Sequence, residues 1–278
     1  MCYNHFYIME NTVVFDIETK KEFAEVGGRD FVHKLGISVL AAYTSHDGSY
    51  HVFEEHELPK FEEMIKATDL LVGFNIKGFD IPVLQPYTSI NLKEIPMLDM
   101  MDDVVQGVGF RVSLDNLART TLNISKSADG LQALQWFREG RIQEVKDYCV
   151  QDVKVTKELY QYGKEHGHIK FVSRDAMGEI SIPVRWGEDF QGDVFQVLKS
   201  ALESRKSVEI DYVTKNPQDG GDSRNTRLVD IYALDAATVE GYCHLRRGNR
   251  VFKIDRILRA KRTNNDYQLH SDVQSTLL

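Results

Sequence analysis

The chain has 278 residues, of which 42% are hydrophobic and 27% are charged, and this predicts a globular protein long enough for two domains. No apolar run approaches the ~18–20 residues of a membrane span, and the start has no basic flank before an apolar core, so we expect neither a membrane segment nor a signal peptide. Three widely separated cysteines argue against a disulfide framework or a cysteine-rich zinc site and favour the cytoplasm.

The net charge of −8 is unevenly distributed along the chain. Residues 194–278 carry 14 Lys and Arg against 11 Asp and Glu, whereas the rest of the chain carries 20 against 31. Within 246–262, eight basic residues accompany one acid, Asp255. The acidic first part and the basic second part therefore predict different partners.

The first part of the chain is predicted to form an α/β domain with a mixed sheet. We expect strands at 13–17 and 69–75 and a hairpin around the turn His46–Gly48. The expected helices are 58–67, a helix opening within 78–87, 113–122 with Ser113 as N-cap, and about 143–165. Strands followed by alternating strands and helices favour a layered α/β fold.

The second part is predicted to be a small β-barrel behind one helix. The helix is expected at 193–205, and short strands at 208–214, 227–234, 240–247 and 250–262. Regularly spaced short strands are typical of such a barrel. We therefore predict domains at 1–187 and 194–262, followed by a tail at 263–278.

The long helix places one acid on its apolar side. At about 100° per residue, Asp152 falls near the middle of the apolar stripe, and Tyr148 lies one turn earlier toward its edge. The lysines of this helix lie on the opposite face. A carboxylate in an apolar setting costs several kcal/mol unless it is paired, so Asp152 requires an explanation.

Three further acids have equally apolar surroundings. Asp80 stands between apolar runs, and Asp16 and Glu18 project to the same side of a buried strand. A cluster of carboxylates is stable only with protons or cations. Because carboxylate oxygens prefer hard cations, these acids indicate a site for Mg²⁺ or Mn²⁺.

The motifs "FDIET", "GFNIKGFD" and "YCVQD" resemble, in order, the three motifs of the DEDD 3′–5′ exonucleases of the ribonuclease H-like superfamily. Tyr148, four residues before Asp152, matches the tyrosine-bearing subclass, since the histidine subclass would have His at position 147. The likeness is greatest to the exonuclease domain of family B DNA polymerases and covers about residues 10–170. The resemblance implies a ribonuclease H-like fold and a two-metal hydrolysis of phosphodiester bonds.

The resemblance also implies individual roles. Asp16, Glu18 and Asp152 would bind one metal ion, Asp16 and Asp80 a second, and Tyr148 would orient the attacking water. Two further residues, Thr19 and Asn75, would contact the terminal nucleotide. Asp99 is expected to support packing near the site.

Each residue also has a simpler explanation. Asp152 could be a hydrogen-bonded core acid, Asp80 could cap the helix that follows it, and Tyr148 could be an ordinary core aromatic. Asp16 and Glu18 could end an exposed strand. The joint occurrence of all five in the order of the motifs favours the metal site.

The stretch "YCHLRRGNRVFKIDRILRA" resembles the core of WYL domains, and the likeness extends over about residues 194–262. It implies a small SH3- or Sm-like barrel that binds nucleic acid or a nucleotide-like ligand, commonly in a regulatory role. Arginine pairs well with phosphate. The candidate contacts are Arg224, Arg227, Arg247, Arg250 and Arg256, and the alternative is a solvated basic face.

We therefore expect a cytoplasmic 3′–5′ exonuclease that needs two divalent metal ions and carries a WYL-like module. Its expected partner is nucleic acid, with single-stranded DNA favoured over RNA. The alternative is a nucleic-acid-binding regulator or an assembly subunit whose exonuclease fold does not catalyse.

Overall fold

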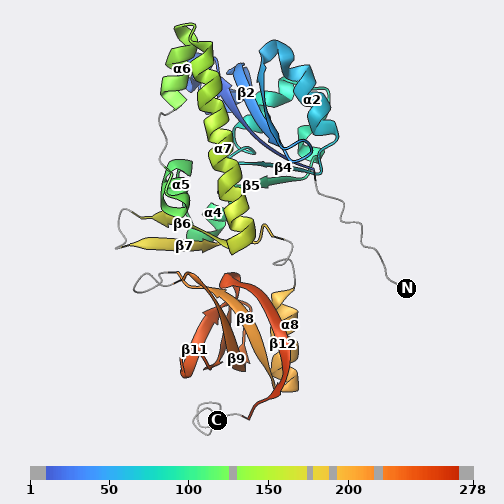
Figure 1. Ribbon diagram of the computed structural model, residues 1–278, viewed down its shortest axis with the longest axis vertical. Coiled ribbons are helices and arrows are strands. Elements are labelled where there is room, and N and C mark those ends of the chain that lie inside the picture. The colour runs from blue at the N-terminus through green and yellow to red at the C-terminus, as the bar shows by residue number, and fades with distance from the viewer. Residues whose placement is uncertain (1–10, 125–129, 174–177, 188–192, 216–221, 269–278) are drawn as a thin grey trace, which may run out of the picture. The chain divides into compact units, whose positions relative to one another are not determined.

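The computed structural model describes residues 11–124, 130–173, 178–187, 193–215 and 222–268 (Figure 1). The chain separates into two compact units, residues 1–159, here the N-terminal unit, and residues 160–278, here the C-terminal unit. Among the described helices, none is both long and apolar enough to cross a membrane.

The N-terminal unit contains the predicted mixed sheet, with the strand order β3-β2-β1-β4-β5. β1 pairs antiparallel with β2 and parallel with β4, so the sheet changes direction at its centre. β2 and β3 form the predicted hairpin, and Gly48 at its turn has a left-handed φ of 71°. The strands are β1 (Thr12–Thr19), β2 (Ile37–Thr44), β3 (Ser49–Glu54), β4 (Leu70–Gly73) and β5 (Met97–Asp99).

The helices of this unit include all those predicted. Ser113 caps α5 by accepting a hydrogen bond from the backbone N–H of Asn116, as expected. The helix predicted within 78–87 is short and continues as a 3-10 turn at Gln85–Tyr87. The helices are α1 (Phe23–Val26), α2 (Leu58–Lys66), α3 (Asp80–Leu84), α4 (Met100–Val108), α5 (Leu114–Leu122), α6 (Gly130–Arg138) and α7 (Ile142–His166).

Alternation along β1 separates the core from the site. Phe15 belongs to the main hydrophobic core and lies 5.6 Å, centroid to centroid, from Phe61 of α2. The next residue, Asp16, projects to the opposite face because successive side chains of a strand alternate. On that face lies α7, whose Cys149 contacts Asp16. One strand thus contributes to the core on one side and carries acids on the other.

The C-terminal unit starts with the last turns of α7 and contains an antiparallel sheet of order β11-β10-β9-β8-β12. Asp193 caps α8 through the N–H of Gln196. A hairpin, β6 with β7, was not predicted. The elements are β6 (His168–Val172), β7 (Glu179–Pro183), α8 (Val194–Ser204), β8 (Lys206–Val213), β9 (Arg224–Leu234), β10 (Thr238–Cys243), β11 (Gly248–Lys253) and β12 (Ile257–Asp266).

The end of this sheet differs from the prediction in two respects. The predicted strand 250–262 is divided by a 3-10 turn at Ile254–Arg256. β12 then continues to Asp266, inside the predicted tail, because Tyr267 is anchored by its hydroxyl to the carbonyl of Ile231. No ladder between β11 and β12 occurs in the described part of the chain, so the closed barrel stays a prediction.

Candidate active site

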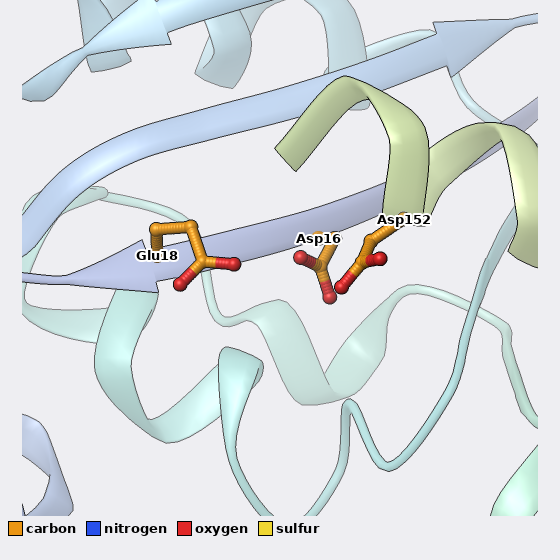
Figure 2. A group of neighbouring side chains, drawn as sticks. All are labelled: Asp16, Glu18 and Asp152. Atoms are coloured by element: carbon orange, nitrogen blue, oxygen red, sulfur yellow. The ribbon is translucent and has the colours of Figure 1, made fainter. Parts of the chain in front are cut away.

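Three of the predicted acids lie together on the face of the sheet that α7 covers. Asp16 and Glu18 come from β1 and Asp152 from α7, and each offers a carboxylate oxygen within 4.8 Å of the others (Figure 2). Asp152 is 6% exposed, in agreement with its predicted place on the apolar stripe of the helix. The strand and the helix therefore bring together acids that are about 135 residues apart.

The strand is irregular where it leaves the site. The pairing of β1 with β2 shifts between Glu18 and Thr19, and such a bulge redirects the side chains that follow it. The hydroxyl of Thr19 donates a hydrogen bond of 2.9 Å to the carbonyl of Lys21. This bond uses the hydroxyl proton, and the oxygen of Thr19 keeps lone-pair capacity toward the cavity.

Asp80 is the most buried of the four acids, at 3% exposure. Its Oδ1 accepts a 3.1 Å hydrogen bond from the backbone N–H of Ile17, which ties α3 to β1. The alternative that Asp80 caps this helix is wrong, because the N-cap is Phe79 and Asp80 is the first helical residue. Burial, followed by the charge of Asp16, raises the pKa of Asp80 well above its ordinary value.

Tyr148 lies one helical turn before Asp152 and is 7% exposed. Burial raises its pKa above the usual value, and the charge of Asp152 and a hydrogen bond to it act in the same direction. The phenol therefore stays protonated at ordinary pH and donates to Asp152. A phenol in this state can orient a water molecule, but it is a poor base.

Cys149 is a member of the site that the sequence analysis did not identify. Its thiol is fully buried and donates to the backbone carbonyl of Asp16 at 3.4 Å, with Sγ 3.8 Å from Oδ2 of the same residue. Cys149 thus fixes α7 against β1 beside the acids. The helical stripe predicted its burial, but only the approach of β1 reveals this contact.

Asn75 lies in the loop between β4 and α3 and has a left-handed φ of 67°. Asp99 holds this loop by accepting hydrogen bonds from the backbone N–H groups of Asn75, at 2.6 Å, and Lys77, at 2.9 Å. Asp99 also caps α4 through the N–H of Met101. Asp99 therefore supports the structure around the site, as predicted, by holding the loop of Asn75 and the start of α4. Arg111, which was not predicted, donates to the side-chain oxygen of Asn75.

A cavity of about 300 Å³ collects the predicted residues of this unit. Its apolar lining includes Phe23, Phe74, Phe79 and Leu131, and Leu131 is 71% exposed. The polar side chains predicted from the sequence that line it are Asp16, Glu18, Thr19, Asn75, Asp80, Tyr148 and Asp152. The acidic donors offer only oxygen, which suits a hard divalent cation such as Mg²⁺ or Mn²⁺. The rings suit a nucleic-acid base.

The predicted arginines of the C-terminal unit have three different surroundings. Arg256 is 9% exposed and donates to the carbonyls of Val213, at 2.7 Å, and Ser181, at 2.8 Å. Its predicted phosphate contact is therefore corrected to a structural role, because both donors hold β7 and β8. Arg224 pairs with Asp211 at 2.8 Å. Any phosphate contact by Arg224 would compete with this ion pair.

Arg227 is 6% exposed, and its guanidinium lies 5.6 Å from the ring centroid of Tyr212 and 3.2 Å from the hydroxyl of Thr214. Arg247 and Arg250, in contrast, are exposed at the β10–β11 hairpin. Phosphate contacts by these three residues stay predictions. Arg247 and Arg250 are the two that a nucleic-acid strand could reach without a rearrangement of the protein.

Comparison with known families defines the class of the chain. The RNase_H superfamily matches residues 13–163, more than half of the chain, and the chain belongs to this superfamily. The WYL domain family matches residues 193–262. The protein therefore combines a ribonuclease H-like fold with a WYL domain, as the sequence motifs predicted.

No curated protein matches the chain. The solved structures that resemble it have low sequence identity to it. The family B DNA polymerase of the archaeon Pyrobaculum calidifontis is 20% identical, with a TM-score of 0.44 over 55% of this chain and 24% of the polymerase. Exonuclease I of E. coli, in complex with a dA16 oligonucleotide, is 11% identical, with a TM-score of 0.38 over 84% of this chain and 55% of that one. The proteasome accessory factor B/C of Arthrobacter aurescens is 22% identical, with a TM-score of 0.22 over 41% of this chain and 16% of that one. The chain thus spans about a quarter of the polymerase and about half of exonuclease I.

Proposed function

We propose that this protein is a metal-dependent 3′–5′ exonuclease that hydrolyses the phosphodiester bonds of nucleic acid, with single-stranded DNA as the favoured substrate and RNA as the other. The observation that carries the proposal is the cavity that the four predicted acids and Tyr148 line together. Acids gathered in this way repel one another unless protons or cations are present. Burial, and after it the charge of Asp16, raises the pKa of Asp80.

Each residue has a defined part in this proposal. Asp16, Glu18 and Asp152 would hold one divalent cation, and Asp16 with Asp80 a second. Such cations would stabilise the charge that develops on the attacking and leaving oxygens and would lower the pKa of a bound water. Tyr148 would orient that water by hydrogen bonding.

The rest of the cavity would hold the 3′ end of the nucleic-acid strand. Thr19 and Asn75 would contact the sugar and phosphate of the terminal nucleotide, and the apolar wall would pack against its base. Packing against a ring needs an unstacked base. A single strand supplies such a base at least cost, which is why we favour it over a duplex.

The WYL domain would bind nucleic acid or a nucleotide-like ligand. Arg247 and Arg250 are exposed, and arginine forks suit phosphate. These residues would guide the substrate or sense a regulatory ligand. The buried Arg256 is not part of this surface.

The decisive experiment is a degradation panel. Single- and double-stranded DNA and RNA, labelled at either end, are incubated with the full chain and Mg²⁺, Mn²⁺ or EDTA. The proposal expects stepwise shortening from the 3′ end with either cation and none with EDTA. Tight binding of a single strand without any degradation under all conditions would instead support a non-catalytic regulator or assembly subunit.

A further inference from the structure

Hydrogen bonds from the protein interior hold the loop that carries Asn75. Asn75 has a φ of 67°, a region that Asn enters more readily than most residues. Its backbone N–H donates at 2.6 Å to Asp99, a side chain that is 4% exposed. The backbone of Asn75 is thus positioned from the inside of the unit. Its side chain is free to be positioned from another direction.

That second direction is Arg111. Its Nη2 donates at 2.7 Å to Oδ1 of Asn75, over a separation of 36 residues in the sequence. Glycine at position 78 leaves room for this bond, since a Cβ there would lie 3.0 Å from the same Oδ1. The side-chain oxygen of Asn75 therefore lies between the guanidinium of Arg111 and the backbone of Gly78.

This contact decides which end of the amide serves as a donor to the cavity. A flipped amide would set the NH₂ group of Asn75 against the donors of Arg111, which have no acceptor capacity. The oxygen therefore faces Arg111, and the NH₂ group is the end left for other partners. Since Asn75 lines the cavity with the acids, that end can only recognise a hydrogen-bond acceptor.

We propose that Arg111 is a positioning residue that makes Asn75 a hydrogen-bond donor to an oxygen of the terminal nucleotide. This inference rests on the proposed nuclease function. The acceptor would be a phosphate or sugar oxygen, because every nucleotide carries both whatever its base. Arg111 acts through Asn75, so its loss removes the orientation of the amide while the acids remain in place.

The test is a double-mutant cycle with Arg111→Met and Asn75→Gly. Methionine keeps the length of the arginine stem without its donors, and glycine accepts the left-handed backbone of position 75. The matched control is Arg119→Met, which removes an exposed arginine of α5 that pairs with Asp115 at 3.5 Å. Thermal unfolding of every variant confirms that the fold is retained.

Two quantities are measured for each variant. Binding of a fluorescent single-stranded oligonucleotide is measured in EDTA by anisotropy, and KM and kcat are measured with Mg²⁺. We expect Arg111→Met to weaken binding and raise KM about tenfold, as for the loss of one hydrogen bond to a charged or polar partner, with kcat changed less than threefold. Arg111→Lys should restore part of the loss.

The cycle separates positioning from direct contact. If Arg111 acts through Asn75, the double variant binds no more weakly than Asn75→Gly alone. Additive losses, or no loss in Arg111→Met beyond that in Arg119→Met, would overturn the proposal. A methylphosphonate at the last linkage identifies the acceptor: a penalty of Arg111→Met that disappears with it assigns a phosphate oxygen, and a penalty that persists assigns a sugar oxygen. Should the wild-type chain degrade nothing, the proposed function fails, while binding in EDTA still decides the role of Arg111.

Discussion

The cavity of the N-terminal unit and the arginines of the C-terminal unit use charge in opposite ways. In the cavity, the four predicted acids come together, and burial, followed by the charge of Asp16, raises the pKa of Asp80. In the C-terminal unit, Arg256 and Arg224 direct their donors to groups of their own fold. Both sets were candidates for binding when only the sequence was considered.

The difference shows how to distinguish a functional charge from a structural one. A charged group that has no like charge beside it and whose hydrogen bonds end on its own fold is already compensated, and a ligand would have to replace those bonds. The acids of the cavity also accept hydrogen bonds from their own fold, but they lie beside one another. Like charges gathered around one cavity gain from an external cation. The acids of the cavity therefore indicate a cation-binding site more strongly than the number of arginines in the C-terminal unit indicates a phosphate-binding site.

The largest expected effect comes from removing an acid of the cavity. Asp152→Ala should lower Mg²⁺-dependent degradation of a single strand by ~100-fold or more, because it removes a metal ligand. Asp147→Ala is the matched control, since Asp147 is an exposed acid of the same helix that accepts from Gln143. Equal activity of the two variants would place the chemistry elsewhere.

A smaller loss is expected for Tyr148→Phe. Removing only the hydroxyl should lower kcat by roughly 10- to 100-fold, the range for a residue that orients a reacting group. Because the pKa of Tyr148 is raised above its usual value, the high-pH limb of the wild-type rate profile should not belong to this phenol. A limb that disappears in the Phe variant would show that the phenol titrates during the reaction.

The exposed arginines should give a still smaller and salt-dependent effect. Arg247→Glu with Arg250→Glu should weaken binding of a single strand several-fold at moderate salt and lower the slope of log K against log salt by about 1–2. Arg256→Met should instead lower the melting temperature, since it leaves buried carbonyls without donors. An unchanged salt slope in the double variant would exclude these two residues as phosphate contacts.

Local patterns in the sequence were sufficient to predict on which face of its strand or helix Asp16, Glu18 or Asp152 lies. Alternation along β1 placed Asp16 and Glu18 on one face, and helical periodicity placed Asp152 on the buried side of α7. Strand alternation and helical periodicity each depend on one element alone, so the spacing of residues within a motif is enough to predict them. The mixed sheet followed from the order of strands and helices in the same way.

Contacts between distant segments could not be predicted in this way. Arg111 meets Asn75 across 36 residues, and Cys149 meets Asp16 across 133. Neither contact leaves a periodic signal in either segment. The same limit explains Arg256: a basic stretch looks the same whether its arginines face a ligand or, as here, the carbonyls of Val213 and Ser181.

The smallest effect concerns stability and follows from the raised pKa of Asp80. A raised carboxyl pKa means that the folded chain holds a proton at pH values where the unfolded chain has released it. The free energy of unfolding therefore falls as the pH rises from the ordinary range of aspartate, near 3.9, through the pKa of the folded state. Above that window the charged Asp80 is a constant penalty to the metal-free protein.

Asp80→Asn should relieve this penalty while keeping an oxygen to accept from Ile17. In EDTA at pH 7–8 the variant should melt higher than the wild type, by about 2–4 °C for each kcal/mol relieved, and the gain should shrink toward pH 4, where the wild-type carboxyl is also neutral. With Mg²⁺ present the order should reverse, because the wild type alone would keep its full set of anionic ligands. A variant that melts lower in EDTA at pH 7–8 would show that Asp80 is compensated within its own fold, as Arg256 is, and the contrast between the two units would be lost at this residue.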